Sequence, residues 1–401
     1  MADALKFETI CATAGVSKDG AYRAVSPPLY LSANFAWESP EDKPQYDYSR
    51  SGNPTREQLE SAVAELEGAA SGVVVSSGMA ALNLVLNLVS PGEKVLAPHD
   101  CYGGTHRLLE ARARQGHFEL VFVDQSDAQA LAQAFTAPPK LVLIETPSNP
   151  LLRITDIRAC VKLAKACGAI TVADNTFLSP LFQKPLELGC DVVVHSTTKF
   201  LNGHSDVVGG AVLSREKDLG EELAWWANCT GVTGAAFDAF LTLRGIRTLS
   251  PRLLRQQETT LHIVDTLQGD DRVARVNYPG IETHPGHAIA KQQQSGFGSM
   301  FSVELVEGID VVEFLKQLDH FSIAESLGGF ESLVCLPAMM THAAMPPAAR
   351  EVAGIGERLV RFSIGLEHEK DLERDILAAL DRAGVAGANN PDASGKRLAS
   401  G

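Results

Sequence analysis

Two short apolar runs in the sequence lead directly into side chains that can react. Residues 170–173 run into Asp174, and residues 192–194 run through a polar stretch into Lys199. Desolvation near a buried strand penalises the charged form of an amine, so a lysine at this position is unusual. Lys199 alone could still be a structural ion pair, but a carboxylate and an amine at neighbouring strand ends suit covalent chemistry on a carbonyl compound.

The segment Ser77-Gly78-Met79 adds a site for a negatively charged group. It lies between a predicted strand, residues 72–76, and a predicted helix, residues 79–89. A glycine turn at a helix start presents unpaired backbone N–H groups to a phosphate, although alone it is more often an ordinary connecting turn. The amine, the carboxylate and these donors together match the needs of pyridoxal 5'-phosphate (PLP): a Schiff-base partner, a group that keeps the ring nitrogen protonated, and phosphate ligands.

Tyr102 lies in a polar segment, residues 98–104, and could stack on a flat ring or be an ordinary half-buried aromatic residue. Potential metal ligands occur in and just after the same segment. No pair among them has the spacing of a known metal motif, so we expect no metal site. These residues are His99, Cys101 and His106.

The elements that would position these residues alternate regularly along the chain. Short apolar runs that alternate with amphipathic segments indicate a mostly parallel sheet sandwiched by helices. In such α/β sheets, ligands bind at the carboxyl ends of the strands, where the candidate residues lie. The predicted strands are 72–76, 94–97, 120–123, 141–144, 170–173 and 192–194, and the predicted helices are 55–67, 79–89, 105–114, 157–167, 222–228, 237–245 and 251–267.

A chain of 401 residues is long enough for two or three domains. Residues 1–57 have little periodicity and are predicted to form an N-terminal arm. Residues 58–255 form the predicted large domain, which would carry the PLP site. The pattern then changes, and residues 256–385 are predicted to form a smaller α+β domain. Residues 386–401 are mostly small and polar and are predicted to be a flexible tail.

The composition excludes several classes of partner. The chain carries 35 Lys and Arg residues and 49 Asp and Glu residues, a net charge of −14, which disfavours binding to nucleic acids or anionic membranes. An uncharged stretch over residues 68–92 is interrupted by Ser76-Ser77-Gly78, so neither half is long enough to cross a bilayer. The seven cysteines are scattered, which is typical of a reducing compartment. We therefore expect a cytoplasmic protein that acts on small molecules, with no nucleic-acid or membrane partner.

Several longer motifs form a more specific pattern. They are Asp47-Tyr-Ser-Arg50-Ser-Gly-Asn-Pro-Thr, Ala97-Pro-His-Asp-Cys-Tyr-Gly-Gly, Asp174-Asn-Thr-Phe, His195-Ser-Thr-Thr-Lys199-Phe-Leu-Asn-Gly-His-Ser-Asp and Ala324-Glu-Ser-Leu-Gly-Gly. Together they resemble the Cys/Met-metabolism family of PLP-dependent enzymes over roughly residues 7–380. The resemblance implies fold type I, the aspartate-aminotransferase-like α/β fold, with a mostly parallel sheet sandwiched by helices and a smaller α+β C-terminal domain.

The resemblance assigns cofactor roles residue by residue. Lys199 matches the Schiff-base lysine that also shuttles protons, Asp174 the carboxylate that pairs with the ring nitrogen, and Tyr102 the stacking tyrosine. The matches to the phosphate-binding residues are Gly78, Met79, Ser196 and Thr198 within one chain, and Tyr48 and Arg50 from the arm of a neighbouring subunit. Sharing of this kind implies a closed oligomer, which we expect to be a homotetramer made of two active dimers.

The resemblance also assigns substrate contacts. Arg361 matches the residue that binds the α-carboxylate, which a planar guanidinium can hold with two hydrogen bonds. Glu325 resembles the acid that receives the amino group of cysteine, and Arg107 the arginine that meets the distal acyl group. Further matches near the carboxylate or the distal region are Asn149, Ser326, Asp47 and Arg50.

Within the family, the similarity is strongest to bacterial members that exchange the γ-substituent of an O-acylhomoserine, notably in Ala224-Trp-Trp-Ala-Asn and Gly231-Val-Thr-Gly. The implied reaction joins O-succinyl-L-homoserine to L-cysteine and gives L-cystathionine and succinate, a transsulfuration step of methionine biosynthesis. Alternatives that stay open are γ-elimination from cystathionine, homocysteine-forming sulfhydrylation, a different acyl group, and a non-catalytic oligomeric binding protein.

Two departures from the family pattern are present. Phe200 stands where the family often has tyrosine, which removes a hydroxyl group that has no proposed catalytic role. Cys335-Leu-Pro337 differs from a histidine-containing stretch near the substrate entrance. The second departure bears on the choice of substrate more than on the chemistry.

Overall fold

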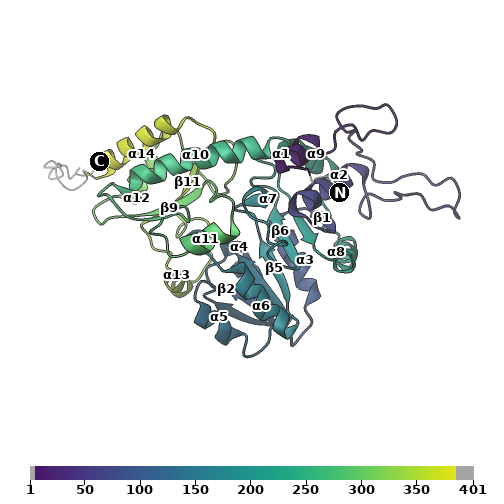
Figure 1. Ribbon diagram of the computed structural model, residues 1–401, viewed down its shortest axis with the longest axis horizontal. Helices are drawn as coiled ribbons and strands as arrows, with labels where there is room; N and C mark the ends of the chain where they lie inside the picture. Colours follow the sequence, from purple (N-terminus) through teal and green to yellow (C-terminus); the bar gives the residue numbers. More distant parts are fainter. Residues whose placement is uncertain (1–4, 385–401) are drawn as a thin grey trace, which may run out of the picture.

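Residues 5–384 are described by the computed structural model, and they are organised around two β-sheets (Figure 1). The larger sheet has seven strands in the order β1-β7-β6-β5-β4-β2-β3. Its strands are β1 (Ser71–Val75), β2 (Lys94–Pro98), β3 (Glu119–Val123), β4 (Leu141–Glu145), β5 (Ile170–Asp174), β6 (Val192–Ser196) and β7 (Gly210–Ser214). All the strands predicted for this sheet are present, each within one or two residues of its expected bounds.

Strand β7 is not predicted by the apolar pattern, and it runs antiparallel to both of its neighbours, β1 and β6. It begins at Gly210, where an added Cβ would lie 2.2 Å from the carbonyl oxygen of Ser77. Glycine therefore lets the strand approach the turn before α3 (Gly78–Val85). The other strand pairs are parallel, which confirms the mostly parallel sheet.

Helices cover both faces of the larger sheet, as the resemblance implies. On one face, α2 (Pro54–Glu67), α6 (Ile157–Cys167) and α9 (Ala236–Ile246) pack against one set of alternate strand residues. On the other face, α3, α4 (Gly103–Arg114) and α8 (Lys217–Thr230) pack against the residues in between. Successive side chains of a strand point to opposite faces of the sheet. Because an apolar core covers each face, most residues of these strands are apolar, and each strand forms a mostly apolar run in the sequence.

The smaller sheet has five strands in the order β10-β11-β12-β9-β8. They are β8 (Val273–Asn277), β9 (Met300–Leu305), β10 (Ser322–Ile323), β11 (Leu333–Cys335) and β12 (Leu359–Ser363). Helix α14 (Glu369–Ala383) packs on this sheet through Leu372, Ile376 and Leu380, although the sequence analysis does not predict it. These apolar residues recur every four positions, which is a helical signal that the sequence does contain.

Helix α10 (Leu249–Gln268) connects the two parts of the chain. Leu249 and Leu253 near its start belong to a core of the larger sheet. Val264 and Leu267 near its end belong to the core of the smaller sheet. The predicted boundary at residue 255 falls inside this helix, and we propose that the two domains meet along it.

The region before α2 contains one short helix, α1 (Phe7–Thr13), and little other regular structure. Figure 1 shows that part of this dark purple segment extends well away from the sheets. Tyr22, Leu31 and Tyr48 on it are exposed, at 91%, 69% and 48%. Large apolar side chains that are exposed on an extended arm are typical of interaction surfaces.

Two expectations concern features outside the sheets. Residues 386–401, the predicted tail, lie outside the described part of the chain. Among residues 5–384, none of the helices combines the length and the apolar character that crossing a membrane requires.

Candidate active site

The carboxyl ends of β4, β5 and β6 bring the predicted reactive groups together. Glu145 at the end of β4 is the register partner of Asp174 at the end of β5, and Asp174 is in turn paired with Val194 of β6. These strand ends open into a cavity of about 410 Å³. The predicted site residues that line it are Gly78, Met79, Tyr102, Asn149, Asp174, Ser196, Thr198, Lys199, Glu325, Ser326 and Arg361.

Lys199 is a largely buried amine in the turn after β6. Its Nζ donates a hydrogen bond to the hydroxyl oxygen of Ser326 over 2.6 Å, so its hydrogen-bond partner is a hydroxyl and not a carboxylate. Burial lowers the pKa of this amine to about 8; the nearby positive charge of Arg361 adds to the effect and Glu325 opposes it. A lysine of this kind is neutral, and therefore nucleophilic, much closer to physiological pH than an exposed one.

The lowered pKa of Lys199 predicts how covalent capture of PLP depends on pH. Only the neutral amine attacks an aldehyde, so in protein freed of cofactor the rate of covalent uptake should rise with pH and level off above about 8. Replacing Arg361 with alanine removes a positive neighbour and should move the midpoint of this rise to higher pH. Stopped-flow absorbance across this pH range measures the rate. A wild-type midpoint near the ordinary lysine pKa of about 10.4 would contradict the prediction.

Asp174 and Glu145 are two carboxyl groups buried side by side. Burial raises the pKa of both, and the charge of Asp174 raises the pKa of Glu145 further. The backbone N–H of Thr176 donates to Asp174 over 3.0 Å and favours its anionic form. Two buried carboxylates on adjacent strands are unfavourable when both are ionised, unless a cation lies between or beside them. A protonated ring nitrogen next to Asp174 would relieve this cost, so the pair fits a pyridinium ring.

Glu145 also has a positioning role that no sequence motif predicts. One carboxylate oxygen accepts from the backbone N–H of Tyr102 over 2.9 Å, and the other accepts from the backbone N–H of Asn149 over 3.1 Å. Glu145 therefore holds in place Tyr102, the candidate stacking residue, and Asn149, a neighbour of the candidate carboxylate-binding residue Arg361. Both donors are backbone atoms, so no residue type in the sequence signals these contacts.

The start of α3 forms a cradle at one end of the cavity. Ser77 caps the helix, since its hydroxyl oxygen accepts from the backbone N–H of Ala80 over 3.0 Å. An added Cβ on Gly78 would lie only 2.6 Å from the Cβ of Ser196. Thr198 contributes a second hydroxyl group to the same cavity. Hydroxyl groups beside the unpaired N–H groups of a helix start fit the phosphate of PLP.

This close approach predicts that Gly78→Ala weakens PLP binding by about tenfold or more, because the methyl group must displace Ser196 or the backbone. Gly356→Ala is the matched control, since an added Cβ at Gly356 meets no atom within 4 Å. Fluorescence titration of the cofactor-free proteins measures the dissociation constants. Equal affinity in the two variants would show that the cradle is not a phosphate site.

Arg361 of β12 is a buried guanidinium with neutral partners. Its Nη1 donates to the side-chain oxygen of Asn149 over 3.0 Å, and its Nη2 donates to the carbonyl oxygen of Ser326 over 2.8 Å. Its Nε has no partner among the described residues, and the residue is only 3% exposed. A buried cation held by uncharged groups is incompletely compensated. An anionic ligand such as an amino-acid carboxylate would complete the site.

Ser326 links the amine to the guanidinium, because its hydroxyl group contacts Lys199 and its carbonyl group contacts Arg361. Its backbone φ is +81°, a left-handed value that residues other than glycine rarely adopt. Such a conformation costs on the order of 1–3 kcal/mol and persists where the surrounding contacts hold it. The two contacts of Ser326 therefore set the relative position of Lys199 and Arg361.

Tyr102 borders the cavity close to the charged groups. Burial raises the pKa of its phenol, and the nearby Glu325 raises it further, against the opposing charges of Arg107 and Arg361. The phenol is therefore neutral at physiological pH and can serve as a flat apolar face. Its ring meets His342 edge to face, with the centroids 6.5 Å apart.

Several predicted site residues do not line this cavity. Asp47, Tyr48 and Arg50 of the arm lie elsewhere on the same chain, and Arg107 is outside the lining as well. Arg50 donates through Nη1 to the carbonyl oxygen of Asn228 over 2.7 Å and lies 5.5 Å from the centre of the Tyr48 ring. If the three arm residues serve a cavity of this kind, a second copy of the chain would have to provide it.

The two departures from the family pattern have different surroundings. Phe200 is almost fully buried and packs against Gly328, where an added Cβ would lie 3.0 Å from the ring. Cys335 on β11 is the register partner of Arg361. Burial raises the pKa of the Cys335 thiol, so the thiol is neutral beside the guanidinium.

Comparisons with known proteins agree with this geometry. The family described as "Cys/Met metabolism PLP-dependent enzyme" matches residues 8–381. The chain is 49% identical to the cystathionine gamma-synthase of Escherichia coli over 92% of this chain and 97% of that protein. It is 42% identical to a cystathionine gamma-lyase of Bacillus subtilis over 94% and 100% of the two chains. The crystal structure of cystathionine gamma synthase from Xanthomonas oryzae pv. oryzae in complex with cystathionine has a TM-score of 0.94 and 55% identity, and covers 95% of this chain and 99% of that one.

Proposed function

The chain belongs to the family of Cys/Met-metabolism PLP-dependent enzymes, and from this we propose that it acts as a cystathionine γ-synthase. In the proposed reaction the thiol of L-cysteine displaces succinate from O-succinyl-L-homoserine and gives L-cystathionine, a transsulfuration step of methionine biosynthesis. The observation that carries the proposal is a single cavity in which Ser326 contacts both the amine of Lys199, whose pKa is lowered, and the buried guanidinium group of Arg361. Relatives with this activity in their names are 49% and 55% identical to the chain.

The cavity offers a partner for each part of PLP. Lys199 would hold the aldehyde carbon, Asp174 the ring nitrogen, and Tyr102 one face of the ring. Ser196 and Thr198, with the start of α3, would hold the phosphate. When bound, PLP supplies an electron-withdrawing ring that stabilises negative charge on the adjacent substrate carbons.

Lys199 is the proposed proton carrier. With a pKa of about 8, its amine can accept a proton from the substrate at Cα, hold it, and return it later in the reaction. Arg361 and Asn149 would bind the α-carboxylate and so orient the reacting carbons toward the amine. The Cγ–O bond breaks, a Cγ–S bond forms, and the proton of the cysteine thiol is released, which leaves succinate as the second product.

The second substrate needs its own contacts. We infer that Glu325, an exposed acid on the cavity lining, receives the amino group of cysteine. Arg107, Arg50 and Asp47 are proposed to surround the distal acyl group, where two arginines would offset the negative charge of the succinyl carboxylate in an acidic protein.

We propose that two chains share each active site, within a homotetramer built from two such dimers. The exposed arm that carries Tyr48 and Arg50 supports this arrangement, because these residues do not line the cavity of their own chain. Co-expression of Arg50→Ala and Lys199→Ala chains should then restore part of the lost activity, since one site of a mixed dimer carries neither change. Co-expression of Asp174→Ala with Lys199→Ala is the control. These two residues line one cavity, so no intact site forms.

Cystathionine γ-elimination is the second candidate, because the B. subtilis relative is named a cystathionine gamma-lyase. Purified PLP-loaded enzyme is offered O-succinyl- or O-acetyl-L-homoserine with and without cysteine, and separately cystathionine. Accumulation of cystathionine supports the synthase proposal. Formation of homocysteine when sulfide replaces cysteine would identify a sulfhydrylase. Rapid breakdown of cystathionine to cysteine and 2-oxobutanoate without any synthesis would overturn the synthase proposal in favour of the lyase.

We also place the enzyme in the cytoplasm. All seven cysteines, Cys229 on the surface included, are free thiols, which is typical of a reducing compartment.

A further inference from the structure

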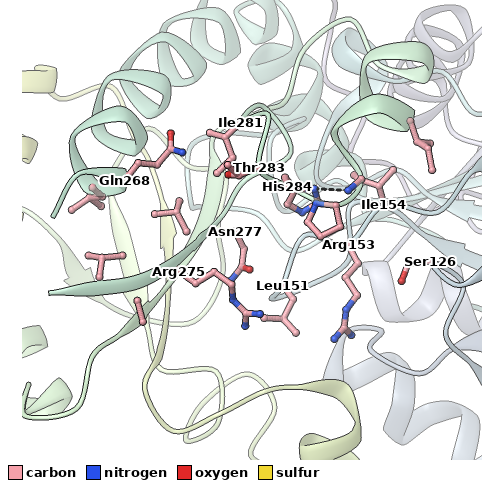
Figure 2. Close-up of a pocket in the computed structure, with 17 residues that line it drawn as sticks. Ser126, Leu151, Arg153, Ile154, Gln268, Arg275, Asn277, Ile281, Thr283 and His284 are labelled. Atoms are coloured by element: carbon pink, nitrogen blue, oxygen red, sulfur yellow. Dashed lines mark hydrogen bonds between the residues drawn. The ribbon is translucent and has the colours of Figure 1, made fainter. Parts of the chain in front are cut away.

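A second cavity lies between the two parts of the chain, away from the candidate active site (Figure 2). Its volume is about 520 Å³, within the range of small-molecule sites. The segments that follow β3 and β4 contribute Ser126, Leu151, Arg153 and Ile154, and the rest comes from the end of α10, from β8, and from residues 281–289. None of its lining residues belongs to the active-site cavity.

The charged residues of this second cavity are two arginines, and no acid lines it. This composition is notable in a chain with a net charge of −14. Figure 2 shows the guanidinium groups of Arg153 and Arg275 at the same end of the cavity, on either side of Leu151. Both arginines are partly exposed at one end of an otherwise uncharged space, and each has a carboxylate partner outside the lining.

Carboxylates outside the lining hold both arginines in place. Nη1 of Arg153 lies 3.1 Å from Asp100, and Nη2 of Arg275 lies 3.1 Å from Glu304. Asp100 is only 3% exposed and also accepts from the hydroxyl group of Ser148 over 2.6 Å. Arg153 makes its two described side-chain hydrogen bonds through Nη1, to His99 and Asp100. The cations are thus positioned before any ligand binds, which lowers the entropic cost of binding.

The remainder of the lining is mostly apolar or uncharged. Apolar side chains cover the walls, namely Leu151, Ile154, Leu267, Val276, Ile281 and Ile289. Burial lowers the pKa of His284 to about 4, and its Nδ1 accepts from the backbone N–H of Gly286 over 3.0 Å. His284 is therefore neutral, and its hydrogen bond to Gly286 stabilises that part of the cavity lining. The positive charge of the lining comes from the two arginines. A ligand ammonium group would find no lining carboxylate, which disfavours the amino-acid substrates themselves.

We propose that this second cavity binds a small organic anion with an apolar body, its carboxylate or phosphate bound at the end of the cavity where Arg153 and Arg275 lie. Guanidinium groups favour either anionic group, and the apolar walls favour a short hydrocarbon over a bare inorganic ion. The site is separate from the PLP-dependent reaction, so its ligand does not have to be a substrate or a product.

Isothermal titration calorimetry of the PLP-loaded enzyme tests the proposal with hexanoate, hexyl phosphate and the neutral isostere hexanamide. Saturable binding of hexanoate or hexyl phosphate, with hexanamide at least tenfold weaker, is expected, and the tighter anion identifies the favoured headgroup. Acetate, which lacks the apolar body, should also bind more weakly. Absence of saturable binding, or equal binding of hexanamide, would overturn the proposal.

Variants locate the site. Arg275→Ala should raise the dissociation constant about tenfold or more by removing one cation. Ala274→Trp, which adds bulk at the cavity lining without changing charge, should do the same. Arg358→Ala is the matched control, because Arg358 is also a partly exposed arginine paired with a glutamate, Glu307, but does not line the cavity.

Binding through the active site gives the opposite pattern. Loss of hexanoate binding in Arg361→Ala, with Arg275→Ala and Ala274→Trp unaffected, would place the anion in the active-site cavity and end the proposal. Turnover of Arg275→Ala should stay at the wild-type level without added anion. Failure of the proposed γ-replacement assay would leave these binding results unchanged, so the two hypotheses are tested separately.

Discussion

Lys199→Ala should lower kcat on the order of 10³–10⁴-fold even at saturating PLP, because we propose that this one amine is both the covalent anchor and the proton carrier. The remaining cavity would keep its phosphate cradle and its carboxylate site, so the variant should still bind PLP, but without a covalent bond. Steady-state kinetics measures the loss. Borohydride treatment followed by peptide mass spectrometry should label Lys199 in the wild type and give no labelled lysine in the variant.

Lys184→Ala is the control for this experiment. Lys184 is also partly shielded and pairs with Glu187 over 3.3 Å, but it lies outside the active-site cavity. Its replacement should leave kcat and the labelled peptide unchanged. Labelling of another lysine in the wild type, or wild-type turnover in Lys199→Ala, would remove Lys199 from the mechanism.

The second large effect is expected at Asp174. Asp174→Asn keeps the size of the side chain but removes the charge that stabilises a protonated ring nitrogen, so kcat should fall on the order of 10²–10³-fold. The same change removes the anion that raises the pKa of Glu145, so the neighbouring carboxyl group should ionise more readily. Turnover and the absorbance spectrum of bound PLP, both followed against pH, measure these effects.

Asp191→Asn separates this catalytic role from a structural one. Asp191 precedes β6 at the opposite end of the strand and accepts from the hydroxyl group of Thr171 over 2.7 Å. Its replacement should reduce stability and leave kcat per folded enzyme unchanged. If both variants lost the same fraction of activity and stability, Asp174 would have only a structural role.

The apolar runs of the larger sheet could be predicted because strands buried on both faces leave a local signal in the sequence. Asp174 and Lys199 could be predicted from the same signal, since Asp174 directly follows such a run and Lys199 follows another after a short polar stretch. The predicted fold type is confirmed by the observed topology and by the matching family. Strand β7 was not predicted because it begins with glycine, which gives no apolar strand signal. Gly210 is needed there because the strand packs closely against Ser77.

Contacts between distant backbone groups could not be predicted. The role of Glu145 depends on the backbone N–H groups of Tyr102 and Asn149, which only the folded chain brings to its carboxylate. The left-handed conformation of Ser326 likewise gives no signal in residue type. Arg153 and Arg275 are far apart in the sequence, and neither lies in a motif, so the second cavity becomes visible only in three dimensions.

Helix α10 has a consequence for the way the molecule loses its structure on heating. One continuous helix takes part in two cores, through Leu253 in one and Val264 in the other. Unfolding of either core would remove the packing contacts of one half of the helix. The two cores should therefore unfold together as one cooperative unit, with a single calorimetric peak. Lys199 and Arg361 come from opposite sides of this junction, so a partly melted enzyme would have no aligned pair and no residual turnover.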